Sequence, residues 1–311
     1  MPHVVALAGG VGGARLAFGL ARLLAADELT VIVNTGDDDT FHGLHVSPDL
    51  DTVMYTLAGE VNPDSGWGRR DDTFTTLAAL TSLGADTWFR LGDRDLSVHI
   101  RRTELLREGH TLSEVTRELC TRLGVTHAIV PMSDNAVRTV VETDSGTMAF
   151  QEYFVRHHCE PRVRRLTFKG VERSTPSPWA EFALDQADAV VLCPSNPFLS
   201  IDPILAVPGL GKAVAGARGP KVAVSPIIGG KAVRGPAGRL FEELAGTQAS
   251  CGAVARHYAG LITHLLIDAT DRALAPEVAA AGPVPVIENT MMRSDDDRIA
   301  LARAVMSTIG K

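Results

Sequence analysis

Residues 4–21 of the chain read VVALAGGVGGARLAFGLA, an apolar segment followed by a glycine-rich turn and a second segment of helical character. The continuous apolar run Val4–Leu7 is typical of a strand that is buried on both faces, and we expect a helix over Ala14–Ala25. A glycine turn between a buried strand and a helix is typical of nucleotide-binding α/β proteins. This stretch therefore predicts the first strand, turn and helix of an α/β fold.

Similar apolar runs recur along the chain, and helix-like stretches separate them. The expected strands are Leu29–Val33, His127–Val130, Ala189–Cys193, Lys221–Val224, His264–Ile267 and Val284–Ile287. The expected helices are Ser113–Leu123, Trp179–Asp188, Asp202–Ala215, Ala237–Leu244, Gly252–Thr263 and a last helix capped by Ser294. A repeated order of strand and helix predicts a Rossmann-like, doubly wound α/β fold with a mostly parallel sheet.

Two stretches interrupt this order, and we expect both to be insertions into a single α/β nucleotide-binding domain of residues 1–311. Residues 60–110 contain much more chain than one crossover helix needs, which predicts an inserted helical subdomain. Residues 136–170 include two β-prone segments, Arg138–Glu142 and Thr147–Phe154, on either side of a turn-forming Asp-Ser-Gly sequence. This pattern predicts an inserted β-hairpin.

The composition excludes several classes of protein. The chain of 311 residues is 45% hydrophobic, 22% charged and 5% aromatic, unlike disordered, collagen-like or coiled-coil proteins. Its net charge of −7 offers no electrostatic footprint for nucleic acid or for an anionic membrane. The N-terminal residues lack the pattern of a signal peptide, and no apolar run approaches the roughly 18 residues of a membrane span. We therefore expect a cytoplasmic protein with no nucleic-acid or membrane partner.

The cysteines give no sign of a zinc site or of a disulfide framework. Their positions are scattered, without a C-x-x-C pair: Cys120, Cys159, Cys193 and Cys251. We expect free thiols.

Five of the expected strands are followed at once by a polar or glycine-rich segment. These segments are residues 9–13, 34–39, 131–135, 194–197 and 225–231. If the strands are parallel, all five segments lie along one edge of the sheet. The carboxyl ends of the strands in an open α/β sheet are the usual place for ligands. We expect the functional site at this edge.

The glycine-rich turn has the properties of an anion site. Gly10, Gly12 and Gly13 would let backbone N–H groups approach a phosphate, and the following helix would present its positive end. The turn is not a P-loop, and it fits the dinucleotide fingerprint badly because Arg15 stands where a third glycine belongs. Arg15 could itself contact phosphate. Packing alone could also explain such a turn.

Aspartates form a second group of candidates. Asp37 and Asp38 follow the second strand, Asp49 and Asp51 come soon after, and Arg94 stands between two further aspartates. Because Pro48 favours extended backbone in the residue before it, we expect an extended segment in which Asp49 and Asp51 point to one side. Carboxylates beside a phosphate loop suggest Mg²⁺, with Asp37, Asp38 and Asp51 as its ligands. Each aspartate could instead serve a turn or a helix cap. Arg94 could be an ion-pair hub or a ligand clamp.

Further polar residues have two possible roles. Ser133, Ser195 and Asn196 offer hydroxyl and amide groups suited to a base or a phosphate, but they could also cap helices. Three histidines lie near the acidic segments without the spacing of metal ligands, and we expect ordinary polar residues: His42, His45 and His99. The absence of a G-x-S-x-G motif gives acyl-enzyme chemistry no support.

The motifs, taken in order, resemble those of the 2-phospho-L-lactate transferase family. These enzymes and their bacterial phosphoenolpyruvate-using relatives attach a phospho-acid to the deazaflavin Fo in the biosynthesis of coenzyme F-420. The matching stretches cover nearly the whole chain: Ala8–Arg15, Val33–Asp38, Pro48–Thr52, Leu91–Asp95, Pro131–Asp134, Phe150–Glu152, Pro194–Pro197 and Ser225–Gly230. The resemblance implies a Rossmann-like core with an inserted subdomain, commonly a homodimer, that binds Mg²⁺, Fo and a phospho-acid linked to guanosine diphosphate.

The resemblance also implies roles for individual residues. The nucleotide, GDP or GMP, would be held by Gly10, Gly12, Gly13, Ser195, Asn196, Gly229 and Gly230. Fo would contact Asp49 and Arg94, which together with Asp51 are the catalytic candidates. The terminal ribityl hydroxyl of Fo would attack the phosphorus that bears the organic acid, GMP would depart, and Asp49 could accept the proton. The acid could be 2-phospho-L-lactate, phosphoenolpyruvate or another three-carbon phospho-acid. One local departure from the family pattern is Asp202, which stands where relatives carry glycine.

Two other functions fit parts of the sequence. A nucleotide-sugar-binding regulatory protein could share the fold and the glycine turn without transferase activity. The presence of both Pro48–Thr52 and Leu91–Asp95, which the resemblance assigns to the deazaflavin side, favours the transferase. A nicotinamide oxidoreductase is disfavoured because the glycine fingerprint is imperfect and no single acidic residue closes the second strand.

Overall fold

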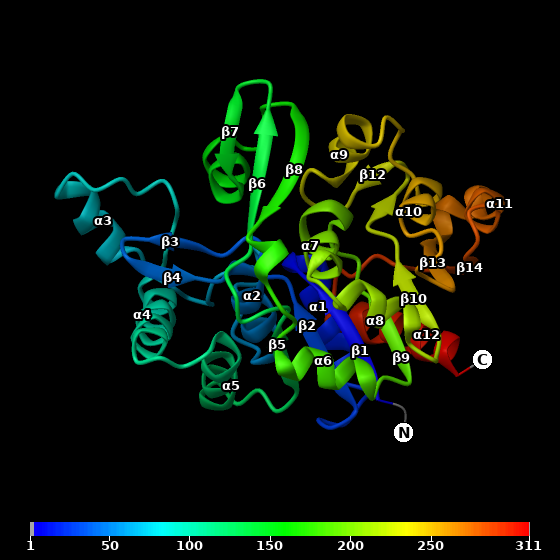
Figure 1. Ribbon diagram of the computed structural model, residues 1–311, viewed down its shortest axis with the longest axis horizontal. Helices are drawn as coiled ribbons and strands as arrows, with labels where there is room; N and C mark the ends of the chain where they lie inside the picture. The colour runs from blue at the N-terminus through cyan, green and yellow to red at the C-terminus, as the bar shows by residue number, and fades with distance from the viewer. Residues whose placement is uncertain (1–2, 311) are drawn as a thin grey trace.

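The computed structural model describes residues 3–310, and a seven-stranded sheet lies at its centre (Figure 1). The strands are β1 (Val4–Ala8), β2 (Leu29–Val33), β5 (Ala128–Pro131), β9 (Ala189–Leu192), β10 (Lys221–Val224), β13 (His264–Asp268) and β14 (Val284–Glu288). Their order is β14-β13-β10-β9-β1-β2-β5, and every neighbouring pair is parallel. The predicted Rossmann-like fold is confirmed, and all seven predicted strands are present.

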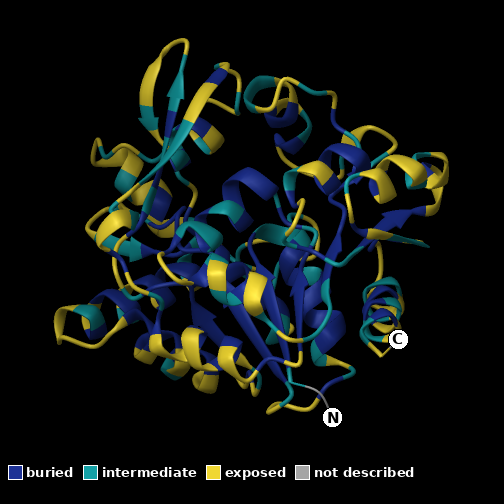
Figure 2. Ribbon diagram, turned by 45° about the vertical axis from the view of Figure 1, so that its right-hand side comes forward, coloured by how far each residue is buried: buried dark blue, intermediate teal, exposed yellow. Residues whose placement is uncertain are grey.

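The sheet separates two hydrophobic cores because successive side chains of each strand point to opposite faces. In β1, Val5 and Leu7 enter one core, whereas Val4, Ala6 and Ala8 enter the other. One core is covered by α1 (Gly10–Ala21), α2 (Pro48–Leu57), α4 (Asp93–Arg107), α5 (Leu112–Arg122) and α12 (Asp295–Ile309). The opposite core is covered by α6 (Pro178–Asp185), α7 (Asp202–Ala206), α8 (Leu210–Gly216), α9 (Ala237–Leu244), α10 (Cys251–His257) and α11 (Ala275–Ala280). Figure 2 shows the central strands mostly in the dark blue of buried residues.

The order of the strands reverses at β1. The chain moves from β1 to β2 and β5 on one side, and then returns to β9 on the other side. The loops after β1 and β9 therefore face each other at the carboxyl edge, which is the usual ligand position in doubly wound folds.

Several helices differ from the predicted bounds for local reasons. The first helix begins at Gly10, four residues before the predicted start, so the glycines belong to its first turn. The helix predicted over Asp202–Ala215 is two helices, because Pro208 cannot donate a backbone hydrogen bond to continue the first one. The last helix begins as expected, with a capping box between Ser294 and Asp297.

The segment between β2 and β5 carries the inserted helices. A short hairpin, β3 (Asp39–Phe41) and β4 (Leu44–Val46), precedes α2, and α3 (Thr75–Ser82) and α4 follow. Phe41 stacks on Phe89 with ring centroids 3.9 Å apart, and Trp88 packs edge-on against Phe41. These aromatic contacts hold the hairpin against the chain that leads into α4.

The expected hairpin is part of a small antiparallel sheet of three strands. Strands β6 (Arg138–Thr143), β7 (Gly146–Ala149) and β8 (Val163–Lys169) pair in the order β7-β6-β8. The hairpin of β6 and β7 is confirmed, but the second predicted strand is too long because the chain enters the short helix η1 (Glu152–Arg156). In Figure 1 this sheet rises at the top of the view, on the same side as β12 and α9.

The remaining short elements lie in loops. They are β11 (Ile227–Ile228), β12 (Lys231–Ala232), η2 (Val171–Arg173), η3 (Pro197–Ile201) and η4 (Ala269–Leu274). All four cysteines are free, as predicted. Within residues 3–310, no single helix has the length and apolar character to cross a membrane, although the bent pair Pro197–Ala206 and Leu210–Gly216 together meets those two criteria.

Candidate active site

The glycine turn after β1 packs directly against the loop after β9. The backbone N–H of Gly9 donates to Ser195 Oγ at 3.0 Å, and that hydroxyl donates to the Gly9 carbonyl oxygen at 2.8 Å. A Cβ atom on Gly12 would lie 2.3 Å from the Pro194 carbonyl oxygen, and one on Gly13 would lie 2.5 Å from Ser195 Oγ. Packing against the loop after β9 therefore disfavours a side chain at both positions, whether or not a phosphate approaches.

Asp49 lies in the first turn of α2 and contacts the first turn of α1. Its Oδ1 accepts a 2.6 Å hydrogen bond from the backbone N–H of Gly10, and its Oδ2 accepts a 2.9 Å bond from Asn34 Nδ2. The same amide group donates to Asp37 Oδ1 at 3.3 Å. Asn34 thus joins the loop after β2 to the start of α2. From the sequence, Asn34 could be placed only within the polar segment 34–39, because its partners are distant along the chain or depend on the loop conformation.

Asp49 and Asp51 do not point to one side, and the prediction of an extended segment was wrong. Pro48 is the first residue of helix α2, a position that suits proline because its missing N–H would have had no partner there. Residues of a helix turn by about 100° each, so two residues apart face different directions. Asp49 faces the glycine turn, whereas Asp51 faces α4.

Asp37, Asp38 and Asp49 form a buried group that we call the carboxylate cluster. Burial raises the pKa of Asp49 to about 6, and the charge of Asp38 acts in the same direction. Burial raises the pKa of Asp37 well above its ordinary value, with further contributions from the charges of Asp49 and Asp38. The neutral form of these carboxyl groups is favoured, because the charged forms are shielded from water and would repel one another.

Asp38 leaves one oxygen without a partner. Its Oδ2 accepts from Ser47 Oγ at 2.9 Å and lies 3.0 Å from His45 Nε2. Its Oδ1 is buried and has no hydrogen-bond partner among the described residues. A buried, unpaired carboxylate oxygen is costly, and a hard cation would satisfy it. This oxygen of Asp38 therefore offers one ligand for a divalent cation.

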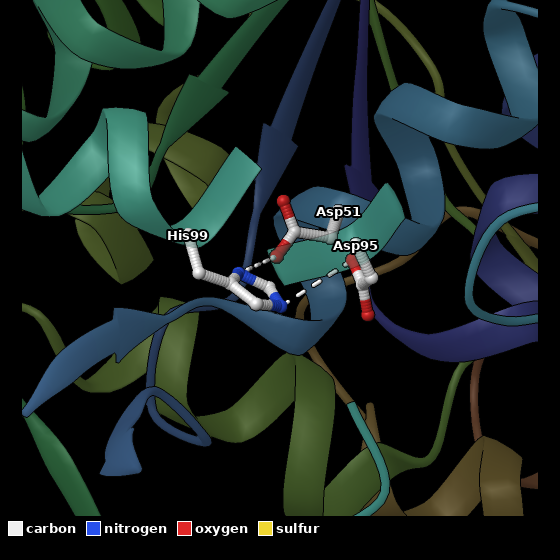
Figure 3. A group of neighbouring side chains, drawn as sticks. All are labelled: Asp51, Asp95 and His99. Carbon is white, nitrogen blue, oxygen red and sulfur yellow. Dashed lines mark ion pairs between the residues drawn. The ribbon is translucent and has the colours of Figure 1, made fainter. Parts of the chain in front are cut away.

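Asp51 belongs to a second buried group. Arg102 donates to both of its carboxylate oxygens, to Oδ2 at 3.0 Å and to Oδ1 over a shorter distance. His99 lies between two aspartates, with Nδ1 3.7 Å from Asp51 Oδ2 and Nε2 3.3 Å from Asp95 Oδ1 (Figure 3). Tyr55 OH donates to Asp95 Oδ1 at 2.7 Å. These contacts lock α2 against α4.

The second group could also hold a metal ion by its geometry alone. Ligand atoms of Asp51, Asp95 and His99 lie within 4.8 Å of one another. The guanidinium of Arg102, however, already compensates the charge of Asp51. His99 was expected to be an ordinary polar residue, and its spacing of four residues from Asp95, on one face of a helix, was the signal that could have placed it here.

Arg94 is exposed in the first turn of α4. Its Nη1 donates to the Arg70 carbonyl oxygen at 3.1 Å, and its backbone N–H donates to Asp72 Oδ1 at 2.7 Å. Among the described residues, neither Asp93 nor Asp95 forms an ion pair with it, which disfavours the ion-pair hub. A pocket of about 180 Å³ adjoins this turn, with these residues among its lining: Asn62, Trp67, Phe74, Arg90, Gly92 and Asp95.

Two of the remaining candidates, Ser133 and Gly229, form hydrogen bonds to other residues of the protein. Ser133 Oγ donates to the Thr175 carbonyl oxygen at 2.6 Å and accepts from Asn135 N–H at 3.0 Å. The N–H of Gly229 donates to both carboxylate oxygens of Asp271, at 3.0 and 3.1 Å. These contacts fix loops at the edge of the sheet.

Asn196 retains a free donor. Its Oδ1 caps η3 by accepting from Phe198 N–H at 3.0 Å, while its Nδ2 is buried without a partner in the described residues. Gly230 lies next to Gly229 with a positive φ of 74°. Asp202 lies on the neighbouring α7, where its Oδ1 is 2.8 Å from His257 Nε2.

The family model described as 2-phospho-L-lactate transferase CofD matches residues 4–304. The chain belongs to this family. Members of the CofD family with high similarity include a phosphoenolpyruvate transferase of Streptomyces griseus, 44% identical over 310 residues that cover 98% of this chain and 97% of the relative. A 2-phospho-L-lactate transferase of Methanococcoides burtonii is 38% identical over 304 residues, 98% of each chain.

A solved structure of a Bacillus halodurans protein shares the fold. It has a TM-score of 0.65 and 14% identity, and the match covers 98% of this CofD family member and 99% of that chain. The membership expected from the sequence motifs is thus confirmed, and so is the fold class.

Proposed function

We propose that this CofD family member transfers a phospho-acid from its guanosine-diphosphate-linked donor to the ribityl hydroxyl of Fo, and that GMP is released. One contact carries this proposal. Asp49, which the resemblance assigns to Fo, accepts a hydrogen bond from Gly10 in the turn that the resemblance assigns to the nucleotide. Donor and acceptor sites that meet at one hydrogen bond are what a direct transfer requires.

Asp49 is suited to accept the proton of the attacking hydroxyl. A general base works best when its pKa lies near the operating pH, and burial raises the pKa of Asp49 to about 6. In the transfer, a bond forms between the hydroxyl oxygen and the phosphorus that bears the organic acid. The bond from that phosphorus to the bridging oxygen breaks, and its electron pair leaves with GMP. The hydroxyl proton passes to Asp49.

We assign Mg²⁺ to Asp37 and Asp38 of the carboxylate cluster. The unpartnered Oδ1 of Asp38 and the raised pKa of Asp37 support this assignment. When bound, Mg²⁺ would neutralise charge on the phosphates. Asp51, the third ligand expected from the sequence, is compensated by Arg102 and would support the site through its position on α2.

Arg94 and the adjoining pocket support binding of the deazaflavin. The pocket is lined by Trp67 and Phe74, whose rings can stack on an aromatic ligand, and Arg94 has an exposed guanidinium. At about 180 Å³ the pocket is smaller than the roughly 300 Å³ of ordinary ligand sites. Binding of Fo would therefore require side chains that line the pocket to move apart.

The decisive experiment is a reconstituted transfer assay. Purified protein is incubated with Fo, MgCl₂ and guanylated donors made from phosphoenolpyruvate and from 2-phospho-L-lactate, since relatives are named for both acids. Mass spectrometry should detect GMP and a phosphodiester of Fo with one of the acids. Absence of product with both donors would contradict the proposal. Nucleotide binding without product would instead favour the regulatory protein of the same fold. The homodimer implied by the resemblance stays a prediction.

A further inference from the structure

One end of the small antiparallel sheet lies next to the carboxylate cluster. The backbone N–H of Thr139, in β6, donates to the Gly36 carbonyl oxygen at 2.7 Å, and Gln151 Nε2 donates to the Asp37 carbonyl oxygen at 2.9 Å. A Cβ atom on Gly36 would lie 2.8 Å from Thr139 Oγ1. Figure 1 shows that the end where β6 begins and β8 ends is the one directed toward the main sheet. The start of β6 is therefore one wall of the candidate active site.

Arg138 and Lys169 are neighbours at this end of the small sheet. They are directly opposite each other in the antiparallel pair of β6 and β8, so their side chains leave the same face. Arg138 Nη1 donates at 3.0 Å to the carbonyl oxygen of Val137, the preceding residue, and neither cation forms an ion pair among the described residues. Like charges directly opposite each other destabilise a strand pair. An anion bound between them would offset this cost.

The positive charge of Arg138 acts on the carboxylate cluster. Burial, followed by the charges of two neighbouring aspartates, raises the pKa of Asp37, and the charge of Arg138 opposes this shift. The guanidinium of Arg102, by contrast, is engaged by both carboxylate oxygens of Asp51. Arg138 is thus a cation beside the carboxylate cluster that no carboxylate of the described chain has bound.

A series of contacts leads from the glycine turn to Arg138. Gly10 donates to Asp49, and Asn34 donates to both Asp49 and Asp37. Asp37 is in turn the group on which the charge of Arg138 acts. The glycine turn and Arg138 therefore lie on different sides of Asp49, which is the proposed proton acceptor. With the nucleotide on one side of the reacting phosphorus, the organic acid has the other side, toward Arg138.

We propose that Arg138 binds the carboxylate of the phospho-acid that is transferred, with Lys169 adding a second positive charge. This inference rests on the transfer reaction proposed above, and it assigns the acid end of the donor to the start of β6. Phosphoenolpyruvate and 2-phospho-L-lactate, for which relatives are named, both carry a carboxylate in addition to the phosphate group. A planar guanidinium donates two parallel hydrogen bonds to a carboxylate. Arg138 is thus a specificity-determining residue that distinguishes a phospho-acid from a phosphate ester without a carboxylate.

Donor binding without Fo tests the role of Arg138 separately from the transfer reaction. Isothermal titration calorimetry in MgCl₂ compares guanylated 2-phospho-L-lactate with its methyl ester, which keeps both phosphates but has no carboxylate. Wild-type protein should bind the acid at least about tenfold more tightly than the ester, a typical effect for hydrogen bonds to a charged group. Arg138→Gln should lose most of this preference, by binding the acid about tenfold more weakly and the ester as wild type does.

Two further variants show whether the effect belongs to the guanidinium. Arg138→Lys keeps the charge without the paired donors, so its preference for the acid should lie between those of wild type and Arg138→Gln. It also carries the test if circular dichroism shows that Arg138→Gln does not fold. Arg165→Gln is the matched control, because Arg165 is an exposed arginine of β8 whose Nε lies 3.9 Å from Glu142 Oε1. This control should keep the wild-type preference.

Several results would overturn the assignment of Arg138. They are a wild-type protein that binds neither donor or prefers neither, a full preference for the acid in Arg138→Gln, and an equal loss of affinity for acid and ester. If the preference depends on Arg138 but the wild type makes no product with Fo, the transfer proposal fails and the carboxylate site stands. If the wild type makes product while Arg138→Gln keeps the full preference, the carboxylate site fails and the transfer proposal stands.

Discussion

The backbone N–H of Gly10 donates a 2.6 Å hydrogen bond to Oδ1 of Asp49. This contact joins the first turns of α1 and α2, which are 39 residues apart along the chain. The positive ends of two helices thus lie near one buried carboxyl group, where they favour negative charge on a ligand, while burial keeps the pKa of Asp49 raised. A proton acceptor and an anion site consequently share one corner of the sheet.

Replacement of Asp49 by alanine should slow transfer strongly while the protein stays folded. Loss of a general base typically slows a reaction by about 100- to 10,000-fold. The N–H of Gly10 would be left at the first turn of α1, where water can replace its partner. We expect the loss in kcat, measured as product by mass spectrometry, with circular dichroism as the test of folding. Asp39→Ala, in the neighbouring β3, is the control. Unchanged turnover in Asp49→Ala would refute the role of Asp49 as proton acceptor.

Stability without metal should fall as the pH rises through the range in which Asp49 titrates. The pKa of Asp49 is raised from 3.8 to about 6, so between these values the folded protein holds a proton that the unfolded chain has released. The free energy of unfolding should decrease from pH 4 to pH 6, by a few kcal/mol at most, and stay lower above. Asp37, whose pKa is also raised, acts in the same direction. Thermal unfolding at a series of pH values measures this trend.

Millimolar MgCl₂ should restore this stability at pH 8 and have little effect at pH 5, because the cation must compete with protons for the same carboxylates. Asp38→Asn should remove the stabilisation by MgCl₂, whereas His99→Gln should keep it. The opposite pattern would place the cation at Asp51, Asp95 and His99. An equal shift at both pH values would show that the carboxylate cluster does not bind it.

The sheet could be predicted from the sequence because its strands are buried on both faces. Val4–Ala8 and Leu29–Val33 are entirely apolar, and such runs need no knowledge of their neighbours to be recognised. Strand β8 was missed because Arg164, Arg165 and Lys169 are exposed on a small one-layer sheet, so the strand lacks a continuous apolar run. A strand of this kind is recognisable only from its pairing with β6.

The location of the candidate site could be predicted from the sequence, but the orientation of its side chains could not. The five loops do lie at the carboxyl edge, but the orientation of Asp49 depends on whether Pro48 begins a helix or an extended segment. Proline permits both, and contacts with Gly10 and Asn34 select the helix. Likewise, the sequence places Arg102 only within the predicted helical subdomain of residues 60–110, and packing of α4 on α2 is what reveals Asp51 as its partner.

Removal of Arg102 should destabilise the protein strongly. Arg102 and Asp51 are both buried, and Arg102→Met would leave the charge of Asp51 uncompensated, at a cost of about 3–5 kcal/mol in the free energy of unfolding. Urea denaturation measures this loss. The double variant Arg102→Met/Asp51→Leu should recover much of it, since an apolar pair needs no compensation. Arg101→Met, whose ion pairs with Glu104 and Glu118 are exposed, should change stability by less than about 1 kcal/mol. Equal losses in Arg101→Met and Arg102→Met would contradict the structural role of the buried pair.

Replacement of Gly12 by alanine separates packing from ligand binding at the glycine turn. The new Cβ would lie 2.3 Å from the Pro194 carbonyl oxygen, a backbone atom that cannot turn away, so α1 or the loop after β9 must shift. We expect a loss of about 1–3 kcal/mol in the free energy of unfolding, even without nucleotide. Gly216→Ala is the matched control, because it is helical and a Cβ there meets nothing within 4 Å. That control should keep or slightly raise stability. Should Gly12→Ala unfold like wild type in the absence of nucleotide and yet bind GDP weakly, the glycine would be needed for the phosphate rather than for the contact with Pro194.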